Sequence, residues 1–223
     1  MTTILDQPST PSPLRALADR FPRVVGPNDN GRIMTAAEFD AIEESDEEYN
    51  YELIEEVLIV NAAPGPMEAD PNEELGHALR TYAEQNPGII DKTLSEQYIR
   101  TKRSQRRADR VVWIGLGRVP SVKRDIPAIA VEFLSAGHRS WQRDYVHKLE
   151  EYLAEGVKEY WIFDRFRRNL AIFRSADNGV STTVVAAGDK ITSPLLPGFG
   201  LPVNLLLKCA EDWLSVEPDE EPS

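Results

Sequence analysis

Three side chains that lie far apart in the sequence have the types expected of a divalent-metal site. Asp109 stands in a stretch otherwise filled by Val111 and Trp113, and Glu132 lies inside AIAVEFL (128–134), the most hydrophobic predicted strand. A carboxylate there is costly to bury unless a cation or a hydrogen-bond donor compensates it. Two such carboxylates on neighbouring strands would form a pocket of hard oxygen ligands suited to Mg²⁺ or Mn²⁺. Pairing of each carboxylate with a nearby arginine is the alternative.

Lys148 is the third candidate for this site. On a helix starting at Ser140, Lys148 would share one face with Trp141, Tyr145 and Tyr152. That helix directly follows the strand that carries Glu132, so it can fold back over the carboxyl end of the strand. A lysine there could orient a water molecule or steady the charge on a phosphate. Taken alone, a solvated lysine beside acidic neighbours is the simpler explanation.

Charge is distributed unevenly along the chain. The formal net charge is −12, and an acidic surface repels the phosphates of nucleic acid. Residues 98–174 nevertheless hold 17 Lys and Arg against 9 Asp and Glu, whereas the rest of the chain has 8 basic and 28 acidic residues. The run RTKRSQRR predicts contacts to the phosphate backbone of nucleic acid that do not depend on base sequence. They would come from Arg100, Lys102, Arg103, Arg106 and Arg107. A solvated loop is the alternative.

Caps and helix breakers predict the helices that surround these candidates. One helix runs from the capping box at Thr35 to residue 42, one from Asp70-Pro71 to the NPG at 86–88, one from Ser140 to residue 155, and one over 203–214. The second helix would bury an apolar stripe of Leu75, Ala78, Leu79 and Tyr82, and the third a stripe of Val146, Leu149 and Leu153.

Runs rich in β-branched and aromatic residues predict the strands. They cover residues 51–60, 89–100, 107–114, 128–134, 158–164, 170–174 and 180–186. The run 128–134 is apolar enough to be a central strand buried on both faces. Because helices stand at both ends and one crossover helix follows this strand, we predict an α/β fold with a mixed central β-sheet flanked by helices.

The two ends of the chain differ in composition from its middle. Residues 1–30 carry five prolines and predict a flexible arm with a short helix over 14–21, residues 31–208 form the domain, and residues 209–223 hold the end of the last helix and an acidic tail. No apolar run is long enough to span a bilayer, and no secretory signal precedes the domain. A single cysteine, Cys209, excludes an internal disulfide. We therefore expect a cytoplasmic protein with no membrane partner.

The order of these segments resembles a known family. YELIEEVLIV, a helix, a strand with Ala108-Asp109, then VEFLS and RDYVHKLEEYLAEGVKEYWIFD are similar to the Uma-type family of restriction endonucleases, in the PD-(D/E)XK nuclease-like superfamily. The likeness spans about residues 34–205. It implies a restriction-endonuclease-like fold in which Asp109 and Glu132 bind Mg²⁺ or Mn²⁺, with the backbone carbonyl of Phe133 as a further ligand. It also implies that Lys148 is the catalytic lysine and that Glu52 completes the site.

Several positions depart from the family pattern. The superfamily lysine two residues after the second carboxylate is Leu134 here, and the proline before the first aspartate is Ala108. A glycine usual in the first hairpin is replaced by Glu55 or Glu56. The histidine near the start of the second helix is absent, with Asn72 at about its place. If that histidine contributes to activity, this protein is a weakened member.

The sequence therefore leads to one hypothesis and one rival. The hypothesis is a Mg²⁺-dependent endonuclease that hydrolyses phosphodiester bonds of nucleic acid, with DNA favoured over RNA. By analogy with related nucleases that pair to cut both strands, it would act as a homodimer. The rival is a catalytically weak or inactive nuclease-fold module that acts in binding or regulation.

Overall fold

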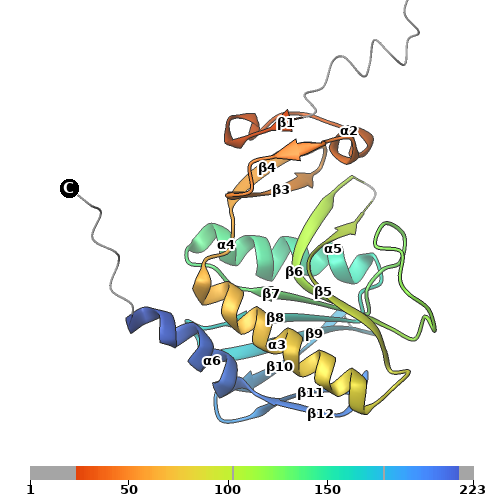
Figure 1. The fold of residues 1–223 in the computed structure, drawn as a ribbon, viewed down its shortest axis with the longest axis vertical. Coiled ribbons are helices and arrows are strands. Elements are labelled where there is room, and N and C mark those ends of the chain that lie inside the picture. Colours follow the sequence, from red (N-terminus) through yellow and green to blue (C-terminus); the bar gives the residue numbers. More distant parts are fainter. Residues whose placement is uncertain (1–23, 102, 178, 216–223) are drawn as a thin grey trace, which may run out of the picture.

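The computed structural model describes residues 24–101, 103–177 and 179–215, and its centre is an eight-stranded mixed sheet (Figure 1). The strand order is β10-β9-β8-β7-β6-β3-β4, and β5 pairs with β6. Among the described strands of this sheet, β7 and β8 pair in parallel and the other pairs are antiparallel. The strands are β3 (Tyr49–Ile54), β4 (Val57–Ala62), β5 (Ile90–Arg100), β6 (Gln105–Ile114), β7 (Ile129–Phe133), β8 (Glu159–Asp164), β9 (Asn169–Ala176) and β10 (Gly179–Ala186). The predicted mixed sheet is confirmed.

Helices cover both faces of the sheet. Helices α3 (Pro66–Gln85) and α6 (Val203–Asp212) pack on one face, and the segment formed by α4 (His138–Gln142), a π-helical turn (Arg143–Lys148) and α5 (Leu149–Ala154) packs on the other (Figure 1). A hairpin of β11 (Lys190–Ser193) and β12 (Leu196–Pro202), which the sequence analysis did not predict, joins the α3 side, and a short 3₁₀ turn (Trp213–Ser215) follows α6. No helix in the described ranges has the length and apolar character needed to cross a membrane.

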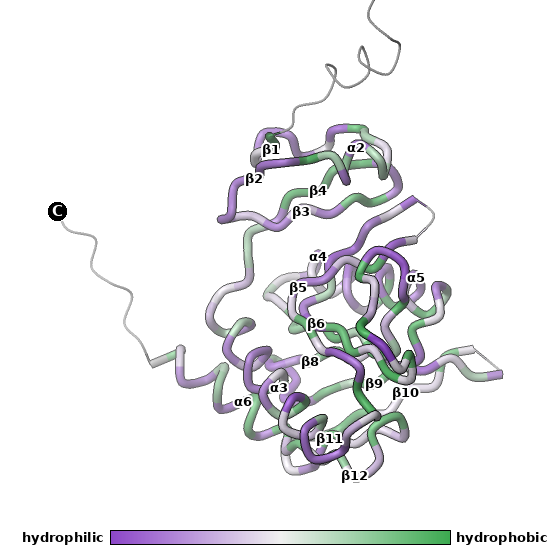
Figure 2. Tube along the Cα trace, turned by 45° about the vertical axis from the view of Figure 1, so that its right-hand side comes forward, coloured by the Kyte–Doolittle hydropathy of each residue, from purple (hydrophilic) through white to green (hydrophobic). Residues whose placement is uncertain are grey.

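The side chains of strand β7 point alternately to the two faces of the sheet and so contribute to two separate hydrophobic clusters. Its side chains Ile129, Val131 and Phe133 pack toward α3 and α6, whereas Ala130 packs toward α5. Glu132 stands two residues after Ala130 and so points to the same face of the sheet, which places its carboxylate toward the helical segment that carries Lys148. Every residue of β7 is buried, and hydrophobic segments gather around β6 and its neighbours (Figure 2).

The N-terminal part of the described chain forms a small layer over the β3–β4 hairpin. It contains β1 (Val24–Val25), a 3₁₀ turn (Pro27–Asp29), α2 (Ala36–Asp40) and β2 (Glu44–Ser45). The capping box at Thr35 is present. Residues 24–30, which the sequence placed in the flexible arm, belong to the fold, because β1 pairs with β2 and Val25 is buried. The predicted helix at 14–21 and the acidic tail after residue 215 lie outside the described residues.

Two predicted helix starts are wrong. Helix α3 begins at Pro66 after Gly65, and Pro71 lies inside it. Pro71 therefore stands in the helix interior, where its missing N–H costs one backbone hydrogen bond, and not in the first turn. The crossover helix begins at His138 after Gly137, and the Ser140 hydroxyl donates back to the carbonyl of Ala136 instead of capping the helix.

The predicted core face of the crossover helix is wrong in part. A π-helical turn holds one more residue than an α-helical turn and so shifts which side chains face inward. Val146, predicted to be buried, is 36% exposed, whereas Asp144, Lys148 and Tyr152 are buried. Leu149 and Leu153 pack against the core as expected. The apolar stripe predicted for α3 is confirmed, with Leu75, Leu79 and Tyr82 buried and Ala78 packed against them.

Candidate active site

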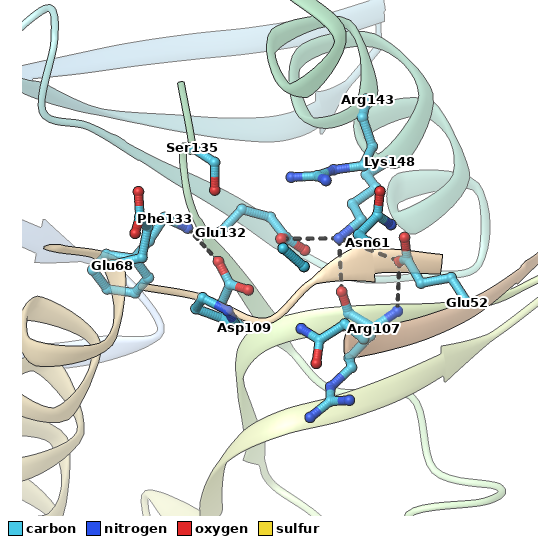
Figure 3. Close-up of a pocket in the computed structure, with 13 residues that line it drawn as sticks. Glu52, Asn61, Glu68, Arg107, Asp109, Glu132, Phe133, Ser135, Arg143 and Lys148 are labelled. Atoms are coloured by element: carbon cyan, nitrogen blue, oxygen red, sulfur yellow. Dashed lines mark hydrogen bonds and ion pairs between the residues drawn. The ribbon is translucent and has the colours of Figure 1, made fainter. Parts of the chain in front are cut away.

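A fork in the sheet creates the site. Strand β6 has β5 along one side, while its other side meets β7 at residues 110–112 and β3 only at Gln105. Between these contacts, the backbone N–H of Arg107 donates to Glu52 Oε1 (2.8 Å), and the carbonyl of Arg107 accepts a hydrogen bond from Lys148 Nζ (2.6 Å) (Figure 3). The side chains of Glu52 and Lys148 therefore satisfy backbone groups of Arg107 that a neighbouring strand would otherwise bond.

The ammonium group of Lys148 joins two carboxylates in this fork. Its Nζ lies 2.9 Å from Glu132 Oε2 and 3.4 Å from Glu52 Oε1. The second oxygen of Glu132 accepts a hydrogen bond from the Tyr152 hydroxyl at 3.3 Å. Each of the three charged side chains is at most 4% exposed. The alternative of a solvated surface lysine is therefore excluded.

Burial and charge set opposite protonation tendencies in this cluster. Burial raises the pKa of Glu132 well above its ordinary value, against the attraction of Lys148. Burial also opposes ionisation of Glu52, but the charges of Lys148 and Arg106 outweigh it and lower the pKa of Glu52. Burial would lower the pKa of Lys148, but Glu132 and Glu52 raise it above its ordinary value. Lys148 is thus a fixed cation at neutral pH, beside one ionised carboxylate and one whose charge is disfavoured.

Asp109 reaches the same fork from β6. Its Oδ2 accepts the backbone N–H of Phe133 at 2.6 Å, which joins β6 to the end of β7 (Figure 3). Burial raises the pKa of Asp109 to about 7, against the attraction of Lys148, and the negative charge of Glu96 adds to the rise. In both Asp109 and Glu132, burial therefore outweighs the nearby positive charge and disfavours the ionised carboxylate.

The backbone of Asp109 is held from the opposite face of the sheet. Glu96, at its register position on β5, has a φ of 54°, and the strand pairing is interrupted there. The Asn72 amide on α3 donates to the carbonyl of Asp109 (2.9 Å) and accepts from Arg110 Nε (2.6 Å). Gly76 leaves room for the Arg110 guanidinium, because a Cβ there would lie 2.5 Å from it. Asn72, noted above as a departure, is thus a positioning residue for Asp109.

The pocket around these groups is small and polar. Its volume of about 50 Å³ admits an ion with a few waters but no organic ligand. Besides the predicted residues, the pocket is lined by four side chains that no sequence pattern indicated: Asn50, Asn61, Glu68 and Arg143. Arg143 stands five residues before Lys148, one π-helical turn, so α-helical spacing gave no signal for it. Arg143 also pairs with the buried Asp144 at 2.7 Å.

The donor set of the pocket fits a hard divalent cation. Among the described residues, no three His, Cys, Asp or Glu side chains come together as a metal site by themselves. Mg²⁺ commonly needs only one or two protein carboxylates and keeps several waters. The N–H and C=O of a strand residue point to the same side, so the Phe133 carbonyl faces the gap that contains Asp109. Asp109, Glu132 and this carbonyl supply oxygen ligands only, and a cation between them would favour ionisation of both carboxylates.

The predicted phosphate-binding run is largely paired with carboxylates. Arg106 is 2% exposed and makes a bidentate bridge to Glu151 (2.6 and 2.8 Å), so it cannot contact an external backbone. The others are paired as follows: Arg100 with Asp40, Arg103 with Glu55 and Glu56, and Arg107 with Glu96. Lys102 lies outside the described residues. Among the described residues of this run, only Arg107 lines the pocket.

The fold and the site together place the chain among known proteins. A crystal structure of a putative nuclease belonging to DUF820 from Anabaena variabilis ATCC 29413 is similar, with a TM-score of 0.63 and 17% sequence identity over 79% of this chain and 99% of that chain. The fold is therefore that of a nuclease-like α/β protein. The Uma2 family, described as putative restriction endonuclease, matches residues 36–204. This chain belongs to that family, as its motifs indicated. No curated protein matches the sequence.

Proposed function

We propose that this protein is a metal-dependent endonuclease that hydrolyses phosphodiester bonds of nucleic acid, with DNA as the favoured substrate. One observation carries the proposal. The buried ammonium of Lys148 bridges Glu132 and Glu52 beside Asp109 and the Phe133 backbone, in a pocket sized for an ion. Membership in a family described as putative restriction endonuclease supports this reading.

Each residue has a distinct role in the proposed reaction. Asp109, Glu132 and the carbonyl of Phe133 would hold Mg²⁺ or Mn²⁺. A divalent ion bound there polarises a phosphate and lowers the pKa of a coordinated water. Because its pKa is raised, Lys148 remains protonated and would balance developing charge or orient the attacking water, not act as a base. Glu52 holds the Lys148 ammonium in place and keeps it charged.

The rival reading also has an observation in its favour. Both oxygens of Glu132 already have partners, Lys148 and Tyr152, and Glu52 is bonded to Lys148 and to the Arg107 N–H. A module that uses the fold only for binding could keep such a closed network. Metal-dependent stabilisation separates the two readings. Mg²⁺ or Mn²⁺ at about millimolar concentration should raise the melting temperature of a metal-binding protein and leave that of an inert module unchanged.

Cleavage of plasmid DNA tests the proposal directly. With Mg²⁺ or Mn²⁺ we expect cleavage that EDTA abolishes, and a loss of about 100-fold or more in Asp109→Asn and Glu132→Gln. The matched control is Glu150→Gln, which changes an exposed glutamate of the same crossover helix and should cleave normally. Equal loss of substrate in EDTA, or full activity of Asp109→Asn, would overturn the proposed mechanism.

A further inference from the structure

A second pocket opens directly beside the candidate active site. It has a volume of about 460 Å³ and is lined by Leu134, Ser135, Gly137, His138, Trp141, Asp164, Phe166 and Arg167. This volume suits a flat organic group, unlike the volume of about 50 Å³ of the pocket that contains Asp109 and Glu132, called here the carboxylate pocket. The mechanism proposed above uses none of these side chains.

The pocket has the composition of a stacking surface. Trp141 stacks on Tyr145 with ring centroids 5.4 Å apart, and Arg167 lies 6.0 Å from Trp141. Phe166, which also lines the pocket, is 53% exposed, and the Arg165 guanidinium lies 4.4 Å from its ring centroid. The exposed ring of Phe166 and the half-buried ring of Trp141 each lie near a guanidinium group and could stack on bases of any sequence, because every base has a π-face.

Its charged groups favour a ligand that carries negative charge near an aromatic ring. The Arg167 side chain is 58% exposed, and its Nε lies 3.7 Å from Asp164 Oδ2, whose carboxylate is buried. Asp164 accepts hydrogen bonds from the Arg167 N–H (2.9 Å) and the Tyr145 hydroxyl (3.2 Å). Asp164 therefore holds Tyr145 and Arg167 in place along one wall of the pocket. The charged group of this pair that solvent can reach is the Arg167 guanidinium.

The two pockets are linked by the chain that follows β7. Phe133 lines the carboxylate pocket, Leu134 lines the aromatic pocket, and Ser135 lines both. A nucleotide whose phosphate lay at a cation held by Asp109 and Glu132 would thus have the aromatic pocket within the same stretch of surface. A base inside a duplex presents only its edges in the grooves, so only an unpaired base could enter.

We propose that the pocket around Trp141 and Phe166 binds an unpaired nucleobase next to the phosphate at the carboxylate site, so that the substrate is a single strand or a duplex with a base out of its stack. This inference rests on the proposed function and narrows its substrate class. The contact we propose is stacking of the base on an aromatic ring, which DNA and RNA can both make. The pocket makes no prediction about base sequence.

Binding without cleavage tests the inference. Fluorescence anisotropy of the full chain in EDTA would compare a labelled single strand, the matching duplex, an RNA strand of the same sequence and an abasic strand of equal length and charge. We expect the two base-bearing single strands to bind more tightly than the duplex and the abasic strand. Phe166→Ala, an exposed change that should not affect folding, should weaken single-strand binding by about fivefold to 100-fold.

Further variants keep the result interpretable. Trp141→Ala should have a similar effect, and Trp213→Ala, which removes an indole 41% exposed on the C-terminal 3₁₀ turn, is the matched control and should bind normally. Equal affinity for normal and abasic strands, or unchanged binding by Phe166→Ala, would overturn the stacking site even if Mg²⁺-dependent cleavage is found. Base-dependent binding without any metal-dependent cleavage would uphold the stacking site and overturn the hydrolysis.

Discussion

Replacing Lys148 by methionine keeps the length of the side chain and removes its charge. The ammonium lies 2.9 Å from Glu132 and 3.4 Å from Glu52, and all three side chains are nearly inaccessible to solvent. Removing one partner of a buried ion pair costs about 3–5 kcal/mol, because the remaining charge stays buried without compensation. We therefore expect Lys148→Met to lower the free energy of unfolding at pH 7 by about 3–5 kcal/mol.

The loss should depend on pH in a defined direction. Without the ammonium, burial would raise the pKa of Glu132 still further above its ordinary value of 4.5. A folded-state pKa above the unfolded value means that the native protein holds more protons, so stability falls as pH rises. At Glu132 both proteins lose stability in parallel from about pH 4.5 up to the folded-state pKa of the wild type, so the gap between them should widen as the pH rises past that raised pKa and narrow in acid.

Urea unfolding followed by tryptophan fluorescence, repeated over a pH series without added metal, measures both effects. Lys158→Met changes an exposed lysine just before β8 and should alter stability by no more than about 0.5 kcal/mol. A loss in Lys148→Met below about 1 kcal/mol, or one that does not vary with pH, would show that this lysine does not neutralise buried carboxylates.

Three further predictions concern the residues around the site. The raised pKa of Asp109 makes the native wild type bind a proton that the unfolded chain releases, so its stability should fall as the pH rises from 3.8 to about 7. Asp109→Asn should lack this fall and be more stable than the wild type above that range, as measured by urea unfolding. Gly76→Ala should lower stability by about 1–3 kcal/mol in thermal unfolding, because its Cβ would collide with the Arg110 guanidinium. Arg106→Met should cost about 2 kcal/mol in urea unfolding through loss of the bridge to Glu151, and should leave the salt dependence of nucleic-acid binding unchanged.

Each of these changes has a control and a contrary outcome. Gly188→Ala adds a methyl group where nothing lies within 4 Å and should be neutral, so equal losses at both glycines would refute the packing argument. Arg103→Met alters an arginine that is 56% exposed and should change stability by no more than about 0.5 kcal/mol. A weaker salt dependence of binding in Arg106→Met would contradict its buried position. Lower stability of Asp109→Asn above pH 7 would contradict the raised pKa of that carboxyl group.

The elements that carry the site follow from local sequence patterns. The apolar run around Glu132 could only be a buried strand, and the helix that follows it in the chain had to cross the sheet nearby. Their adjacency brings Glu132 and Lys148 together across 16 residues, as the structure shows. Tyr152 completes the pair from the next helical turn, a position that α-helical spacing from Lys148 indicates.

The arrangement of the basic run could not be predicted because its partners are distant. Arg106 pairs with Glu151, 45 residues away, and Arg100 pairs with Asp40, 60 residues away. A free arginine and a paired arginine look the same in a sequence. The fork between β3 and β7 has the same origin, since no local pattern tells which strand pairs with which part of β6.

The π-helical turn was missed for a different reason. Its residues, RDYVHK, have ordinary helical character, so nothing local marks the extra residue. A π-helical turn is defined by backbone hydrogen bonds between residues five apart, which no side-chain pattern marks; within it Asp144 and Lys148 are buried and Val146 is exposed. The β11–β12 hairpin was likewise missed, because its strands are short and interrupted by Pro197 and Gly198.

The most direct test of the central claim is the position of Mn²⁺ in crystals of this protein soaked with the ion, located by anomalous diffraction. We expect a peak about 2.1 Å from one carboxylate oxygen of Asp109, one of Glu132 and the carbonyl oxygen of Phe133. Crystals with no manganese at this position, in which Glu132 remains bonded to Lys148 and Tyr152 at saturating Mn²⁺, would contradict it.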